Sequence, residues 1–452
     1  MSMVAAVISE HFASIVGPEN VVTETDQLGA YRLGGKTPKV GVRPGSGREV
    51  AEIVRFATSE KLSLVPTGAR TKLGMNTPVR EYDLALDVTR LDRVVSYDAA
   101  DLTLSVEAGL PLSKLAGVLA EHRQFLPLAV PFENRATVGG TIASGVDSPL
   151  RQLYGTARDY LLGMEFVTGD GQLVKSGGRV VKNVSGYDLH KLLIGSFGSL
   201  GVITRVSFRT FPAPVSTRAL VASFGSASGA VETRHRIAQS SLRPLTLEIL
   251  SPSAVQLLFA NELPPLANAN WAVVVAFAGA EALVARYEHD LRQIVDRGET
   301  ILLDEAAAHA ALKRVREFVS IALASSPATA IIKMSVLPRQ IPQALDDATR
   351  SAKAEGLRWA AMARGVGVIY FALLPVARDE EARSRTDKVV DEVFRVTQGC
   401  GGNFTAPWYP AEWRKDMTTR KTNRSDLEQM RKIKHAFDPN GVFSPDPLAA
   451  WT

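Results

Sequence analysis

The chain has 452 residues, of which 46% are hydrophobic and 22% are charged. These proportions are typical of soluble globular domains and exclude collagen, coiled coils and extensive disorder. The net charge of +5 is small beside 52 basic and 47 acidic side chains, so it gives little support for a nucleic-acid or membrane-surface partner. The length exceeds what one hydrophobic core usually supports, so we expect at least two domains with a ligand crevice.

The single cysteine, Cys400, excludes an internal disulfide, and it excludes a thiolate zinc site or an iron–sulfur cluster built from this chain alone. The N-terminal segment MSMVAAVISEHFASIVG is interrupted by Glu10 and His11 and has no basic leader, so it does not predict a signal peptide. No apolar run approaches the ~18 residues of a membrane span. We therefore expect a cytoplasmic protein.

Residues 1–213 alternate short β-rich runs with helical patterns and glycine turns. Asp170-Gly171 lies between two alternating apolar runs, which predicts a hairpin. The other strands are expected at 62–68, 82–88, 102–109 and 200–212, with helices at 47–60 and 111–122. This pattern predicts an α+β domain with a mixed sheet, which ends at the proline-rich stretch 211–216.

Residues 214–424 repeat a different unit, in which a strand leads to a long helix and back to a strand. The expected strands are RALVASF, TLEIL, WAVVVAF, TILLD, AIIKMSV and VGVIYFAL, and the expected helices span 227–241, 279–297 and 341–355. Such units predict a second α+β domain, a single sheet with helices on one side. Residues 425–452 form a third segment, a helix opened by a Ser425-x-x-Glu428 capping box and a tail, which we expect to return towards the first domain.

Two glycine-bearing segments could hold phosphate groups. VPTGARTKLG at 65–74 and PFENRATVGGTIASG at 131–145 combine small residues with glycines that let backbone N–H groups converge on an anion. Either segment alone is equally typical of an ordinary turn. Neither a Walker motif nor a G-x-G-x-x-G turn is present, which disfavours nucleotide hydrolysis and a Rossmann NAD site. Two such segments together suggest a dinucleotide.

A series of motifs in constant order carries a family resemblance: VRP at 42–44, P-x-G-x-x-T at 66–71, LDV at 86–88, VEAG at 106–109, TVGGT at 137–141, Y-G-x-x-R-D at 154–159 and G-S-x-G-x-L-G-V-I-T at 195–204. The series resembles the FAD domain of the vanillyl-alcohol-oxidase type, also called PCMH-type. FDPNGVF at 437–443 resembles the end of the C-terminal domain of FAD-linked oxidases. The resemblance implies a PCMH-type FAD-binding domain followed by a ferredoxin-like α+β domain.

The resemblance also implies which residues hold the cofactor. The two segments would cradle the pyrophosphate, and the strand that begins at the GVIT segment would lie beside the isoalloxazine. The residues carried over are Pro66, Thr67, Gly68, Ala69, Arg70, Thr71, Lys72, Leu73, Pro131, Thr137, Gly139, Gly140, Thr141, Ser144, Tyr154 and Ile203. Relatives with a covalent flavin carry a histidine where this chain has Arg70, so noncovalent FAD is implied.

Within this family, the KNVSGYDL run at 182–189 and the KMSVLP strand at 333–338 resemble the glycolate-oxidase branch, with the D-lactate and D-2-hydroxyglutarate dehydrogenases as the next candidates. Those dehydrogenases carry G-D-G-N-x-H and S-G-E-H-G motifs that bind a metal. Here the corresponding stretches are GVGVIYF at 365–371 and GGNFTAPWYPAEW at 401–413, and the seven histidines are isolated in sequence. No metal site is therefore expected.

The resemblance suggests Lys333 as the cation for a substrate carboxylate and Arg316 as a second cation. A lysine that alternates outward to solvent along its strand, and an arginine on a helix surface, would also explain these two residues. Tyr409 is a candidate catalytic residue, although the aromatic stretch Trp408–Trp413 is also typical of packing. For the base that removes the hydroxyl proton, spacing does not separate Tyr187, Tyr370, Tyr409 and Lys182.

The resulting hypothesis is an FAD-dependent enzyme that oxidises a small, glycolate-like 2-hydroxy acid by hydride transfer to flavin N5. The resemblance implies work as one subunit beside a second flavoprotein and an iron–sulfur partner. The alternative is a noncatalytic or electron-relay flavoprotein subunit of a larger dehydrogenase complex, suggested by the missing metal motifs.

Overall fold

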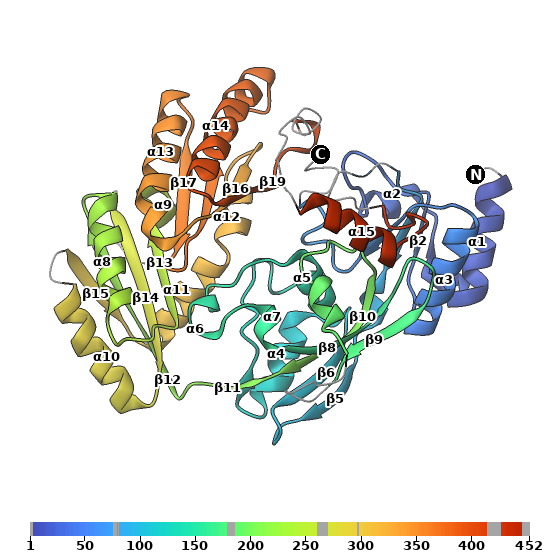
Figure 1. The fold of residues 1–452 in the computed structure, drawn as a ribbon, viewed down its shortest axis with the longest axis horizontal. Helices are drawn as coiled ribbons and strands as arrows, with labels where there is room; N and C mark the ends of the chain where they lie inside the picture. The colour runs from blue at the N-terminus through green and yellow to red at the C-terminus, as the bar shows by residue number, and fades with distance from the viewer. Residues whose placement is uncertain are drawn as a thin grey trace.

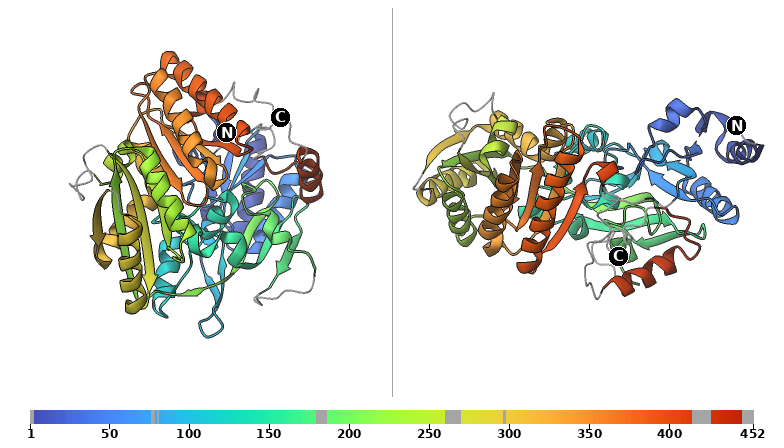
Figure 2. Two further views of the ribbon diagram at one scale, coloured as in Figure 1. Left: turned by 60° about the vertical axis from the view of Figure 1, so that its left-hand side comes forward. Right: turned by 90° about the horizontal axis from the view of Figure 1, so that it is seen from above.

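The computed structural model describes residues 3–75, 79, 81–178, 186–259, 270–295, 298–413 and 426–444. The chain forms two halves, each built on its own β-sheet system (Figure 1). Residues up to Pro212 form the half drawn from blue to green, and the strands and helices from Ser216 to Trp408 form the other half. The two halves lie side by side in all three views (Figures 1 and 2).

The first sheet of the N-terminal half is mixed. Its order is β1 (Val21–Val22), β2 (Val40–Val42), β4 (Leu84–Asp87) and β3 (Leu64–Thr67), with β2, β4 and β3 parallel and β1 antiparallel to β2. Helix α3 (Gly47–Ser59) begins at Ser46, whose side chain accepts a hydrogen bond from Glu49 N at 3.2 Å. Its buried positions recur at helical spacing, so α3 presents one apolar face to the core of this half.

The second sheet of this half is antiparallel throughout. Its order is β5 (Val94–Asp98), β6 (Thr103–Glu107), β10 (Val202–Arg209), β8 (Leu161–Val167) and β9 (Leu173–Gly177). The expected β8–β9 hairpin is present, with Gly171 in the left-handed region at φ 77°. The expectation of a single mixed sheet for this half is therefore wrong: the half has two larger sheets, because the local hairpins pair with β10 and not with β4, and a two-stranded sheet of β11 (Phe211–Pro212) and β7 (Gln124–Phe125).

Shorter elements connect these sheets and shape their edges. They are α1 (Met3–Val16), η1 (Pro18–Asn20), α2 (Thr25–Gly29), η2 (Val88–Arg90), α4 (Leu112–Ala120), β7 (Gln124–Phe125), α5 (Val138–Ser144), α6 (Arg151–Tyr154), α7 (Ala157–Tyr160), η3 (Leu189–Leu192) and β11 (Phe211–Pro212).

The second half contains one eight-stranded antiparallel sheet in the order β15-β12-β14-β13-β17-β18-β16-β19. Its strands are β12 (Ser216–Phe224), β13 (Thr246–Leu250), β14 (Trp271–Gly279), β15 (Glu299–Leu303), β16 (Ala330–Ser335), β17 (Trp359–Arg364), β18 (Val368–Leu373) and β19 (Asn403–Trp408). The sequence pattern did not predict β17 and β19, since β17 has three alanines and no β-branched residue and β19 contains a proline.

Helices cover both faces of this sheet. One face packs against α8 (Ala227–Gln239), α10 (Glu281–Ile294), α13 (Ile341–Ala354) and α14 (Glu380–Gly399), and the other against α9 (Pro252–Phe259), α11 (Glu305–Arg316) and α12 (Phe318–Ala324); the turn η5 (Pro338–Gln340) precedes α13. The expectation of helices on one side only is wrong. The strands are nearly continuous apolar runs, and such strands are buried on both faces.

The C-terminal segment packs against the N-terminal half. Helix α15 (Leu427–Phe437) lies across that half in the views of Figures 1 and 2. The Phe437 ring stacks on Phe166 at 6.0 Å, and Leu64 N donates to Val442 O at 2.8 Å. Asp426 precedes the helix without a side-chain cap, and Ser425, the first residue of the expected capping box, lies outside the described residues.

Candidate functional site

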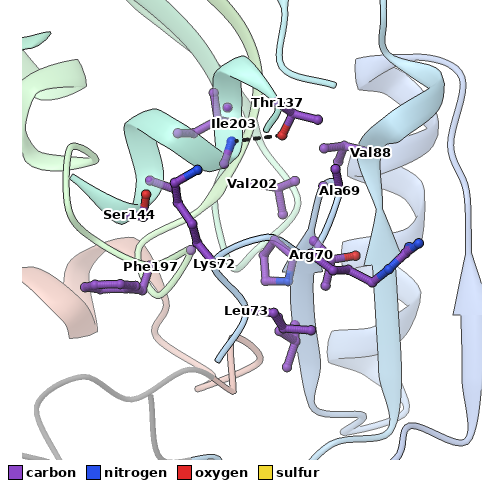
Figure 3. Close-up of a pocket in the computed structure, with 18 of the residues that line it drawn as sticks. Ala69, Arg70, Lys72, Leu73, Val88, Thr137, Ser144, Phe197, Val202 and Ile203 are labelled. Carbon is purple, nitrogen blue, oxygen red and sulfur yellow. Dashed lines mark hydrogen bonds between the residues drawn. The ribbon is translucent and has the colours of Figure 1, made fainter. Parts of the chain in front are cut away.

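A cavity lies between the loop after β3 and helix α5 (Figure 3). Most of the residues implied by the family resemblance meet here: Pro66, Thr67, Gly68, Ala69, Arg70, Thr71, Lys72, Leu73, Thr137, Gly139, Gly140, Ser144 and Ile203 all line it.

The first loop has the backbone geometry of an anion site. Arg70 is in the left-handed region at φ 62°, a conformation that costs a non-glycine residue on the order of 1 kcal/mol. Within the described part of the chain, the amides of Gly68, Ala69 and Arg70 donate no hydrogen bond to protein. Free amides along a left-handed bend form a concavity that suits phosphate.

The Arg70 side chain is fixed outside this concavity. Its guanidinium donates to Asp87 at 2.9 Å and lies 4.6 Å from the centre of the Tyr31 ring. Figure 3 shows the side chain directed away from Lys72 and Ser144. Its charge is therefore already balanced by Asp87.

Close packing joins the first loop to α5. A Cβ added at Gly68 would overlap Thr137 Oγ1, and one added at Gly139 would lie 2.6 Å from Ala108 Cβ. Gly198, at φ 75°, brings a third segment to 3.1 Å from Pro66 Cγ by the same measure. Glycine is needed at these positions because neighbouring chain segments approach closely.

The second glycine segment supplies a wall of the cavity rather than free amides. Thr137 caps α5, since its Oγ1 accepts from Gly140 N at 3.3 Å. Val138 N donates to Leu110 O at 2.9 Å, and Gly139 N donates to Ala108 O at 2.7 Å. The first turn of α5 is thus occupied by protein acceptors, and the amides available to an anion are those of the first loop.

Lys72 is the second charged residue of the cavity. It is 8% exposed, and its Nζ lies 3.4 Å from Thr71 Oγ1. Burial lowers the pKa of Lys72 to about 8, and Glu317 offsets this effect only in part. In Figure 3 the side chain extends from the first loop towards α5 and Ser144.

Three residues implied by the resemblance do not line the cavity. Tyr154 packs its ring against Phe125 at 5.3 Å and Phe211 at 4.9 Å, in an aromatic cluster beside the domain linker. Pro131 and Thr141 are also absent from the lining, although the Thr141 Oγ1 atom is buried without a hydrogen-bond partner.

The cavity also includes residues that were not among those carried over to the cofactor: Leu33, Val65, Val88, Ala143, Phe197, Gly198, Gly201 and Val202. Most are apolar side chains whose local pattern is that of an ordinary core residue. Val65, Val88, Ala143, Gly198, Gly201 and Val202 fall within the quoted motifs and segments, whereas Leu33 lies outside all of them.

A buried ionic cluster lies where the eight-stranded sheet faces the N-terminal half. Arg364 on β17 pairs with Asp147 at 2.6 Å and with Glu248 on β13 at 2.9 Å. Asp147 follows the cavity residue Ser144 by three positions, so one short segment joins the cavity to this cluster.

Lys333 belongs to the same region. It lies on β16 opposite Tyr370 of β18, with its Nζ 6.0 Å from the centre of the Tyr370 ring. Burial lowers the pKa of Lys333, and the nearby Asp147 partly offsets this. Within the described part of the chain no carboxylate pairs with Lys333. The structure thus directs the Lys333 side chain towards the N-terminal half and not outward to solvent.

The pKa shifts within the cluster follow from burial and charge. Burial raises the pKa of Glu248 to about 7 although Arg364 opposes the rise. Burial alone would lower the pKa of Arg364, but Glu248 and Asp147 together hold it above its ordinary value. Burial and Asp147 raise the pKa of Tyr370, so its hydroxyl stays protonated near neutral pH.

The other two catalytic candidates lie elsewhere. Arg316 pairs with Glu133 at 2.7 Å and does not line the cavity between the first loop and α5. Tyr409 packs against Trp413 in the core of the opposite sheet face and donates a hydrogen bond to Asp387 on α14. Neither contacts the cavity between the first loop and α5, because each is held by partners of its own.

Of the proposed bases, only Tyr370 lies near Lys333. Tyr187 is 89% exposed, and Lys182 lies outside the described residues. Among the described residues, no group of three or more His, Cys, Asp and Glu side chains is placed to hold a metal ion. The same part of the chain has no helix that is both long and apolar enough to cross a membrane.

Comparison with known families gives two matches. Residues 38–177 match the model of an FAD binding domain, and residues 213–448 match the C-terminal domain of FAD linked oxidases. The second match alone covers more than half of the chain.

Among curated proteins, the chain is 24% identical to glycolate oxidase subunit GlcD of Bacillus subtilis (strain 168), over 99% of this chain and 98% of that protein. It is 26% identical to a D-2-hydroxyglutarate dehydrogenase of Xanthomonas citri pv. viticola, over 90% and 88%. Glycolate oxidase subunit GlcE of Escherichia coli (strain K12) is 36% identical over 43% of this chain and 55% of its own length.

Solved structures share the fold at low identity. 4-Ethylphenol oxidase from Gulosibacter chungangensis aligns with a TM-score of 0.79 at 15% identity, covering 100% of this chain and 98% of that one. A p-cresol methylhydroxylase with substrate bound aligns with a TM-score of 0.77 at 15% identity, over 100% and 98%. Both halves and their arrangement are therefore shared with these oxidases, as the resemblance implied.

Proposed function

Because the chain belongs to the FAD-linked oxidase family, we propose that it oxidises a small, glycolate-like 2-hydroxy acid and passes the electrons to an iron–sulfur partner subunit. It is an FAD-dependent oxidoreductase of the glycolate oxidase and D-2-hydroxy-acid dehydrogenase type. The substrate, the residues that hold it and the electron acceptor are the proposed part.

The residues of the cavity fit noncovalent FAD. The first loop offers free amides to a pyrophosphate, the lining is mostly apolar, and the charged side chains of the described lining are the cations Arg70 and Lys72. Bound FAD supplies a hydride acceptor at N5. Arg70 stands where a histidine would form a covalent link in the resembling proteins, and its ion pair with Asp87 leaves it no such role.

Lys333 is the observation that supports a carboxylate substrate. A largely buried ammonium group that has no carboxylate partner among the described residues, on the sheet face covered by the FAD-binding half, suits a small organic anion. Tyr370 lies beside it with a protonated hydroxyl, which can donate a hydrogen bond to the same substrate. We assign Lys333 to the substrate carboxylate and Tyr370 to substrate orientation.

A specific observation also favours the electron-relay alternative. Arg364 forms ion pairs with both Asp147 and Glu248. The aromatic side chains of Tyr370 and Trp408 are buried in the core on the sheet face that holds Lys333. A cluster whose charges are largely satisfied within the protein can serve structure alone. The names of the GlcD and GlcE relatives, which are subunits, support action within a complex under either function.

The test is anaerobic reduction of the purified holoprotein. We expect the ~450 nm flavin band to bleach with glycolate, D-lactate or D-2-hydroxyglutarate. Lys333→Met should lower the affinity for the acid that reduces the flavin by about 10- to 100-fold, because a hydrogen bond to a charged group is lost. Lys333→Arg, which keeps the charge, should retain part of the affinity.

Two measurements separate the competing outcomes. The FAD content of Lys333→Met should equal that of the parent protein. Lys175→Met, at an exposed position, should change neither the FAD content nor the affinity for the acid. A flavin that none of these acids reduces, but that a co-purified partner reduces, would establish the electron-relay function and remove the substrate assignment.

A further inference from the structure

Lys72 is a buried lysine that has no ion-pair partner within the described residues. It is 8% exposed, lines the FAD cavity, and makes one hydrogen bond there, to Thr71 Oγ1. Burying an ammonium group without a counter-charge costs free energy. The position therefore calls for an anion that the protein itself does not supply.

The charge of the cavity points in the same direction. Among the described residues that line it, the charged side chains are Arg70 and Lys72, and no carboxylate is present. Asp87 balances Arg70 at 2.9 Å. One positive charge thus remains for the ligand.

The position of Lys72 selects the part of FAD that it meets. The side chain crosses from the first loop towards α5 (Figure 3), and the free amides of Gly68, Ala69 and Arg70 belong to the same loop. The pyrophosphate is the group of oxidised FAD that carries permanent negative charge. An anion held by those amides is within the reach of the lysine on the same loop.

We propose that Lys72 is the counter-ion of the FAD pyrophosphate and that it makes cofactor affinity depend on pH. The inference rests on the FAD assignment and is independent of the proposed substrate, because no hydroxy acid takes part in it.

The charged groups around Lys72 are already engaged. Glu317, at the junction of α11 and α12, accepts from Phe132 N at 2.9 Å and from Glu133 N at 3.3 Å. Arg316 beside it pairs with Glu133 at 2.7 Å. The α5 side of the cavity and the segment 197–203 contribute no titratable side chain to the described lining.

The sign of the pH effect follows from these surroundings. In the protein without cofactor, burial holds the pKa of Lys72 at about 8, and a bound pyrophosphate raises it, since an opposite charge favours the protonated form. Below this pH the lysine is charged in both states, so affinity is constant. Above it, binding must take up a proton, so affinity falls by up to about tenfold per pH unit.

The experiment uses the full chain after removal of its noncovalent FAD, with FAD and ADP as separate probes. The Kd of each is measured from pH 7 to 9.5 by titration calorimetry. For the parent protein we expect both Kd values to rise above pH 8. Lys72→Met should bind both probes about 10- to 100-fold more weakly at pH 7, with the rise between pH 8 and 9.5 removed.

Two further variants complete the design. Lys72→Arg should keep most of the affinity and lose the rise, because arginine does not titrate in this range. Exposed Lys175→Met should behave as the parent. Circular dichroism of each protein without cofactor shows whether it is folded before titration.

Two results would overturn the proposal. One is a folded Lys72→Met protein whose Kd for ADP stays within about threefold of the parent value. The other is a Kd for ADP that is unchanged while the flavin reduction potential moves, since Lys72 would then serve the ring and not the pyrophosphate.

Discussion

Gly68 and Gly74 differ in what surrounds them, although both belong to the first loop. A side chain at Gly68 would overlap Thr137 Oγ1, the atom that caps α5, whereas a Cβ at Gly74 meets nothing within 4 Å. Spacing in the sequence does not distinguish the two glycines. The approach of α5 does.

Gly68→Ala should therefore impair cofactor binding and Gly74→Ala should not. Displacing Thr137 disturbs the cap of α5, which is worth about 1 kcal/mol, and shifts the loop amides at the same time. We expect at least a tenfold rise in the Kd for FAD and a fall in thermal stability for Gly68→Ala. Equal Kd values for the two variants, measured by flavin fluorescence, would contradict this account.

At the scale of elements, Arg364 joins β17 to β13 and to the segment after α5. Its side chain is 5% exposed, and those of Asp147 and Glu248 are 3% and 1% exposed. The pairs connect residues 217 and 116 positions apart in the chain. Removing the arginine leaves the buried Glu248 without its cation and leaves Asp147 with Arg151 alone, at 3.2 Å.

Arg364→Met should lower the free energy of unfolding by about 3–5 kcal/mol, the usual cost of breaking a buried pair. Arg350→Met is the matched control, because Arg350 pairs with Asp347 on the surface, where a pair contributes about 0–1 kcal/mol. Denaturant unfolding of both variants checks the difference. Similar values would show that the buried cluster contributes no more than a surface pair.

At the scale of the whole molecule, the C-terminal segment completes the N-terminal half. Phe443 is 2% exposed in the core of that half, next to Leu64, whose amide and carbonyl bond to Val442 and Ser444. Residues at the two ends of the chain thus share one core. The first loop begins directly after the strand that contains Leu64.

Phe443→Ala should destabilise the FAD-binding half by about 3–5 kcal/mol through loss of burial and the cavity left behind. Exposed Lys432→Ala on α15 serves as the control. Thermal unfolding followed by flavin release measures both. Release at the parent temperature in Phe443→Ala would mean that the tail is not part of this core.

The sequence by itself determined the strands and helices with strong periodicity, the two glycine segments and, through the order of the motifs, the cofactor. These depend on local signals: the β8–β9 hairpin follows from Asp170-Gly171, and α3 follows from a helical apolar stripe after Ser46. The sequence pattern did not predict the helices on the second face of the large sheet, because a continuous apolar strand does not indicate which helices cover which of its faces.

Only the tertiary structure decided which charges meet. The sequence left Lys333 as either a substrate cation or a solvent-facing lysine, and in the structure it lies towards the FAD-binding half. The sequence left Tyr409 as either a catalytic or a packing residue, and in the structure it is buried on the opposite face of the sheet. The sequence presents Lys72 as one residue of a loop, and only the structure shows that no carboxylate of the described residues lines the cavity around it. Hydrophobic patterning acts between near neighbours in the chain, whereas ion pairs and their absence depend on segments hundreds of residues apart, for which a single sequence has no local signal.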